Sequence, residues 1–226
     1  MLNRRHLRIK ILQILYGFYQ DEDLDTTKAK KALDHSIDKM YQLYLLLISM
    51  IAEMQGLAID KIEAGRKKQL PTEEDLHPNT KFVRNATLRI LANSKQLKNR
   101  LSETGVGWGK QRELLRNLHR SLIEDEEYMT YMSSDERSFR HDRESLLRMF
   151  RKHLINETAF HEMLEEESIF WVDDLDLASS MVIKTIKNID EEDEEVDIMP
   201  VWRNDDDDYG NFNISPCDDE NDEDCD

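Results

Sequence analysis

The feature that most constrains this chain is an apolar run inside a long helical segment. Residues 40–54 (MYQLYLLLISMIAEM) place apolar side chains on nearly every side of a helix. Such a helix is stable in water only when other elements cover it on several sides. The densest part, residues 43–51, is shorter than the roughly 20 residues that cross a bilayer. The pattern therefore predicts a buried central helix over residues 28–66 and no membrane span.

The rest of the chain is also helical in pattern. Only 7 Gly and 4 Pro interrupt the sequence, and strand-like alternation is hard to find. Asp25 to Thr27 offer N-caps for the central helix, and Gly65 and Pro71 end it. We expect a loop over residues 71–80 and a turn at Gly105, Gly107 and Gly109. The fold class is all-α, a multi-helix bundle with further helices at residues 4–20, 82–101, 110–123, 124–132, 140–154, 157–168 and 174–189.

Charge divides the chain into two parts. Residues 190–226 contain 18 acidic residues and one basic residue, so they carry the whole net charge of −17. Residues 1–189 are therefore neutral and do not repel nucleic acid. The acidic blocks 191–197, 205–208 and 218–226 lack the apolar content that offsets chain entropy. We predict a helical domain over residues 1–189 and a disordered acidic tail over residues 190–226.

The cysteines indicate the compartment. Cys217 and Cys225 both lie in the acidic tail, away from the helical domain. Two such thiols do not form a disulfide framework, which favours a reducing cytoplasm. The first 20 residues lack the small-residue cleavage site of a secretory signal. The expected location is cytoplasmic.

The first helix is the best candidate for a functional surface. Four basic residues lie within seven positions, and no acidic residue precedes Asp21. In helical projection an apolar stripe is flanked by Arg5 and Arg8 on one side, with Tyr16 on the same side about three turns along. Guanidinium groups match phosphate geometry, and an exposed tyrosine can stack on an unpaired base. The alternative is a basic helix start that is merely solvated. The stripe consists of Leu7, Ile11, Ile14 and Phe18, and His6, Lys10 and Gln13 flank its other edge.

This opening resembles a known family. The pattern Arg4-Arg5-x-x-Arg8-x-x-x-Leu12-Gln13-x-Leu15-Tyr16 is similar to the start of the transcription antitermination factor NusB family. Further stretches resemble longer members that carry a helical extension, namely DKMYQLYLLL (residues 38–47), KIEAGRKKQLPTEEDLHPNTKFVRN and WVDDLDLASSMVIKTIK. The similarity covers about residues 2–203.

The resemblance implies a function without catalysis. In that family the arginine-rich helix binds boxA, a short single-stranded RNA element, together with the ribosomal protein NusE in the RNA polymerase antitermination complex. It implies a NusB-like first helix, an inserted helical region and no cofactor. The RNA-binding residues expected here are Arg4, Arg5, His6, Arg8, Lys10, Gln13 and Tyr16.

The sequence also departs from the family. The Asn-Glu-Ala-type helix and the Phe-Val-Asn-Gly-like motif that close family members do not occur. We therefore expect a truncated or frame-altered chain whose first helix is poorly covered. An exposed apolar stripe on that helix favours self-association into a homodimer.

Other motifs are weaker. Four residues at four-residue spacing could hold a metal, but Asn156 interrupts their helix, so a solvated polar face is favoured. The segment 205–210 fails as a calcium loop because Pro216 stands where glutamate is required. Trp108 and Trp171 are expected to be core anchors. The four residues considered as metal ligands are His153, Glu157, His161 and Glu165.

Two other functions remain open. The chain could be a helical protein–protein adaptor with impaired RNA binding, or a truncated, non-functional homologue of the NusB family. In the adaptor, the acidic tail would compete with RNA for the basic helix. An enzyme accessory domain ranks last, because NusB-like domains precede RNA methyltransferases and no methyltransferase domain follows here.

Overall fold

The computed structural model describes residues 4–19 and 25–200 of the chain. These residues form helices connected by loops and contain no strand, so the predicted all-α class is confirmed. The helices are α1 (Arg4–Tyr19), α2 (Thr26–Arg66), α3 (Glu73–Leu76), α4 (Ala86–Asn93), α5 (Lys95–Thr104), α6 (Arg112–Glu124), α7 (Glu126–Ser133), α8 (Phe139–Lys152), η1 (Leu154–Asn156), α9 (Thr158–Glu167) and α10 (Ile169–Lys187).

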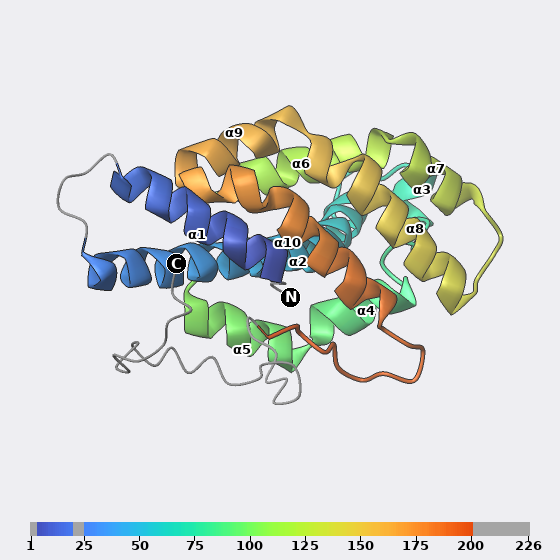
Figure 1. Cartoon of the computed structure of the whole chain (residues 1–226). Coiled ribbons are helices and arrows are strands. Elements are labelled where there is room, and N and C mark those ends of the chain that lie inside the picture. Colours follow the sequence, from blue (N-terminus) through green and yellow to red (C-terminus); the bar gives the residue numbers. More distant parts are fainter. Residues whose placement is uncertain (1–3, 20–24, 201–226) are drawn as a thin grey trace, which may run out of the picture.

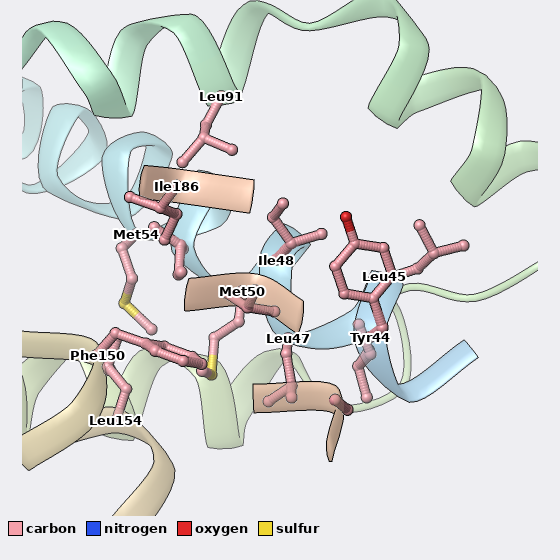
Figure 2. Close-up of a cluster of buried hydrophobic side chains, with 14 of the residues drawn as sticks. Tyr44, Leu45, Leu47, Ile48, Met50, Met54, Leu91, Phe150, Leu154 and Ile186 are labelled. Carbon is pink, nitrogen blue, oxygen red and sulfur yellow. The ribbon is translucent and has the colours of Figure 1, made fainter. Parts of the chain in front are cut away.

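Helix α2 is the centre of the fold, as its apolar composition predicted. The other helices surround it, and α10 packs across it (Figure 1). Figure 2 shows side chains of α2 meeting Phe150 of α8, Leu91 of α4 and Ile186 of α10. The predicted cap is also present, since the Asp25 side chain accepts a hydrogen bond from the Thr27 amide at 3.0 Å. Core packing on several sides therefore positions all the other elements.

By length and composition α2 could also cross a membrane, and it is the one described helix that could. However, 67% of its apolar window is buried by the rest of the protein. This burial is what a core helix of a water-soluble fold shows. The other helices provide the apolar environment that this sequence needs.

Several helix boundaries differ from the prediction. The helix expected over residues 174–189, α10, begins earlier, at Ile169. The helix expected over residues 82–101 is two helices, α4 and α5, because Ser94 turns the chain between them with a ψ of 121°. Its hydroxyl accepts a hydrogen bond from the Leu97 amide at 3.2 Å and so caps α5. The loop expected over residues 71–80 contains the short helix α3, which begins at a capping box between Thr72 and Asp75.

The disorder predicted for the first acidic block, residues 191–197, is wrong. Val196, Ile198 and Met199 are buried against the helices, and the Met199 amide donates to the Tyr44 hydroxyl at 3.2 Å. Glu195 accepts hydrogen bonds from Ser94 Oγ and the Lys95 amide, both at 2.9 Å. These bonds, that of Ser94 first, lower the pKa of Glu195.

The carboxylate lies at the start of α5, where the helix dipole favours an anion. Described residues beyond the predicted boundary at residue 189 thus pack against the helices. The acidic blocks 205–208 and 218–226 and the segment 205–210 lie outside the described residues.

Candidate nucleic-acid interface

Helix α1 packs on the outside of the bundle. It runs beside the first half of α2 in the opposite direction and also reaches the start of α10 (Figure 1). Leu7 is half-buried against the core, and Ile14 is half-buried on the same side. The side chain of Phe18 lies outside the described residues. One side of α1 is therefore fixed and the other faces solvent.

A buried lysine holds α1 in place. Lys10 is 3% exposed, and its Nζ donates to Asp174 Oδ2 of α10 at 2.7 Å and to Ser36 Oγ of α2 at 2.8 Å. Three helices thus meet at one ammonium group. Lys10 was predicted to contact RNA, but this geometry places it inside the protein, away from Arg4, Arg5 and Arg8. Its role is to position the helix.

The local electrostatics follow from this burial. Removal from water raises the pKa of Asp174, and the hydrogen bond and charge of Lys10 oppose that rise. Burial, followed by the charge of Arg5, lowers the pKa of His6. His6 is half-buried at the edge of α1. A neutral imidazole at this position can exchange hydrogen bonds but adds little positive charge near pH 7.

The outward side of α1 presents the arginines. Arg4, Arg5 and Arg8 are all exposed, and the spacings i,i+3 and i,i+4 place them on neighbouring positions of one face. Within the described chain, neither Arg5 nor Arg8 forms an ion pair. Tyr16 is 68% exposed and lies eleven residues from Arg5, so the two share one side of the helix about 16 Å apart along its axis. The structure therefore places the guanidinium groups and one aromatic ring on the solvent-facing side of α1.

Gln13 lies toward α10. Its side chain is exposed, and Nε2 donates to Asp173 Oδ2 at 3.3 Å. The adjacent carboxylates Asp173 and Asp174 thus hold one edge of α1 through Gln13 and Lys10. Sequence reasoning missed this pair, although the sequence WVDDLDL placed two acids early in an apolar helix. A buried acid needs a partner, and that requirement was the available signal.

Much of the apolar surface of α1 points outward. Ile11, expected in the inward stripe, is exposed, because Lys10 occupies the buried centre of the helix face beside Leu7 and Ile14. Helix α1 therefore has a mixed basic and apolar outer surface. The exposed apolar residues are Ile9, Ile11, Leu12, Leu15, Tyr16 and Tyr19.

A separate cavity of about 520 Å³ lies beside Trp108 and Trp171. Both tryptophans are buried, as predicted, and their indole N–H groups donate to the carbonyls of Leu46 and Lys39 at 3.2 and 2.9 Å. Neither indole therefore has a free donor for a ligand.

The four residues considered as metal ligands are not on one helix face. His153 ends α8, η1 intervenes, and His161 lies in α9 with its Nε2 2.9 Å from the Ile155 carbonyl. His153 instead lies between Asp125 and Glu157, at 3.4 and 3.2 Å. Among the residues that the structure describes, no three His, Cys, Asp or Glu side chains are grouped to hold a metal ion.

Comparison with known proteins adds no relative. The chain matches no protein-family model, no curated protein and no solved structure. The surface of α1 is therefore interpreted from its own residues.

Proposed function

We propose that this chain is an RNA-binding transcription antitermination factor similar to the NusB family, acting in the cytoplasm without catalysis. It binds a boxA-like single-stranded RNA on α1 and, with NusE, tethers that RNA near RNA polymerase. The observation that carries the proposal is the exposed arginine cluster on a helix that has four basic residues and no acidic residue. Planar guanidinium groups donate pairs of hydrogen bonds to phosphate oxygens.

The residues have different roles in this proposal. Arg5 and Arg8, with Arg4 beside them, contact phosphates, and Tyr16 stacks on a base. His6 and Gln13 lie at the edge of the surface, where they can bond to base edges or sugar hydroxyls. Lys10 leaves the set of contacting residues and orients the helix from inside. NusE contacts a surface that includes exposed apolar residues of α1 other than Tyr16.

Salt dependence tests the phosphate contacts. With about three contacts to a single strand, log K should fall with log salt at a slope near −2. Changing Arg5 or Arg8 to alanine should flatten the slope by about 0.7 each, because each variant releases one fewer counterion. Fluorescence anisotropy with a labelled boxA-like RNA at four salt concentrations measures this.

The matched control is Arg66→Ala. Arg66 is an exposed arginine at the far end of α2, about 45 Å along that helix from Ser36. This variant removes the same charge and should keep the slope of the unchanged protein. If the slope is the same in all three variants, α1 is not the phosphate-binding surface.

The second candidate is a protein–protein adaptor. The exposed apolar residues of α1 favour it, since contiguous apolar surface of this kind marks a binding site for another protein. Binding of NusE by a form that binds no RNA in the same anisotropy assay would support the adaptor over the RNA-binding factor.

A further inference from the structure

The outer face of α1 combines two kinds of side chain at helical spacing. Arg5, Leu12 and Tyr16 project within about 40° of one another around the helix axis, with Arg8 and Ile9 on either side. All five are exposed. The cations and the apolar groups therefore form one continuous surface.

This combination determines the chemistry of a protein partner. The apolar groups favour a partner that buries them. The guanidinium groups favour carboxylates, because complementary charge attracts the correct segment and repels basic ones. The surface thus fits an acidic peptide that also carries aromatic or aliphatic residues.

The chain itself contains such a segment. Residues 201–226 (VWRNDDDDYGNFNISPCDDENDEDCD) include 11 acidic residues and one basic residue. Apolar side chains lie on both sides of the acidic block 205–208, with Trp202 before it and Tyr209, Phe212 and Ile214 after it. The segment therefore matches the outer face of α1 in both charge and hydrophobicity.

The segment also begins near that face. Met199, the last buried residue among those that the structure describes, donates its amide to Tyr44. Tyr44 lies eight residues (about 12 Å) along α2 from Ser36, the residue that Lys10 contacts. Because α1 runs opposite to α2, Arg4 and Arg5 extend from Lys10 toward the same end (Figure 1). Eight residues beyond Pro200, the chain can reach about 26 Å when extended, enough to bring Asp205 to Asp208 to the arginines.

We propose that residues 201–226 dock on the outer face of α1 in the free protein and that RNA must displace them. The charge, apolar surface and position of α1 support the docking. The regulation of RNA binding also rests on the proposed function. A tethered segment has an effective concentration in the millimolar range, so even weak contacts occupy the face. The apparent Kd for RNA rises as the reciprocal of the unoccupied fraction, so about 90% occupancy at 50 mM salt raises it about tenfold.

The cysteines provide a direct test of the docking. Cys217 and Cys225 are the only cysteines of the chain, so nitroxide labels attach to the segment alone. In isotope-labelled full-length protein at 50 mM salt, we expect the backbone amide signals of α1 to be broadened most. Broadening should decrease at 300 mM salt and in an Arg5→Gln, Arg8→Gln variant, and should persist in the Arg66→Gln control.

Two results would overturn the docking. One is broadening that is absent, or spread evenly over the surface. The other is equal broadening of α1 when the nitroxide and the isotope are on separate, mixed copies of the protein, because the segment would then reach a second copy.

A second experiment measures whether residues 201–226 weaken RNA binding. We change Asp205 to Asp208 to asparagine and the seven carboxylates from Asp218 onward to their amides, which leaves the described body unaltered. This variant should bind boxA-like RNA about tenfold more tightly at 50 mM salt and equally at 300 mM. Unchanged affinity at 50 mM overturns the regulation. If no form binds RNA while the labels locate the segment on α1, the proposed function fails and the docking stands.

Discussion

Replacing Lys10 with methionine is expected to lower the free energy of unfolding by about 3–5 kcal/mol at pH 7. The variant leaves the buried Asp174 carboxylate without the ammonium group that lies 2.7 Å away. An uncompensated charge in the interior costs much more than an exposed ion pair contributes. Urea denaturation followed by circular dichroism measures the change.

The loss of unfolding free energy in the Lys10→Met variant should be smaller at low pH than at pH 7. Burial already raises the pKa of Asp174, and loss of Lys10 raises it further. A carboxyl whose pKa is raised in the folded state favours folding at low pH and loses that contribution as the pH rises through its folded pKa. The deficit should therefore shrink as the pH falls from 7 toward 4.

Two comparisons isolate the buried pair. Lys28→Met removes the same charge from an exposed position on α2 and should change stability by less than about 0.5 kcal/mol. Adding Asp174→Asn to Lys10→Met should restore part of the loss, because the unpaired charge is gone. A Lys10→Met protein as stable as the original at pH 7 would contradict the proposed anchoring of α1.

The second large effect is expected in the centre of α2. Leu47 is 0% exposed and belongs to the cluster that joins α2 to its neighbours (Figure 2). Leu47→Ala should lower the free energy of unfolding by about 2–5 kcal/mol, through lost burial and the cavity that remains. Urea unfolding at pH 7 measures this, with Leu70→Ala as control.

Leu70 receives the same truncation but is 89% exposed, so its variant should stay within about 0.5 kcal/mol of the original. Equal destabilisation by the two variants would mean that α2 is not the centre of the core.

Sequence patterns predicted those helices whose apolar spacing and capping residues agree with the way the helices pack. The apolar run in α2 is stable in water only when it is buried. Asp25 caps the start of that helix, which ends at Arg66, one residue after Gly65. The break at Ser94 was missed because the apolar spacing continues through it. The turn depends on Glu195, which lies 101 residues away and completes the cap.

The acidic block 191–197 shows the limit of composition. Its charge predicted disorder. However, Val196, Ile198 and Met199 are buried against the helices, and Glu195 accepts a hydrogen bond from the Lys95 amide. Average charge does not reveal such pairings. The signal that could have found them is the group of three apolar residues within four positions.

The positions of the candidate residues on α1 were predicted in part. The exposed positions of Arg4, Arg5, Arg8, Gln13 and Tyr16 agree with the helical projection. Lys10 differs because projection cannot tell that an acid 164 residues away lies opposite it. A lysine at the edge of an apolar stripe turns inward when a buried carboxylate is within reach.

The central claim is that the outer face of α1 binds RNA, and chemical-shift mapping tests it most directly. Backbone amide spectra of the full-length protein are recorded while a boxA-like single-stranded RNA is added, with a scrambled RNA of equal length as control. We predict that the largest shifts occur in α1, centred on Arg5, Arg8 and Tyr16, and that they saturate at a lower concentration of the boxA-like RNA. Saturation with the largest shifts on α6 to α9, or no shifts with either RNA, would contradict the claim.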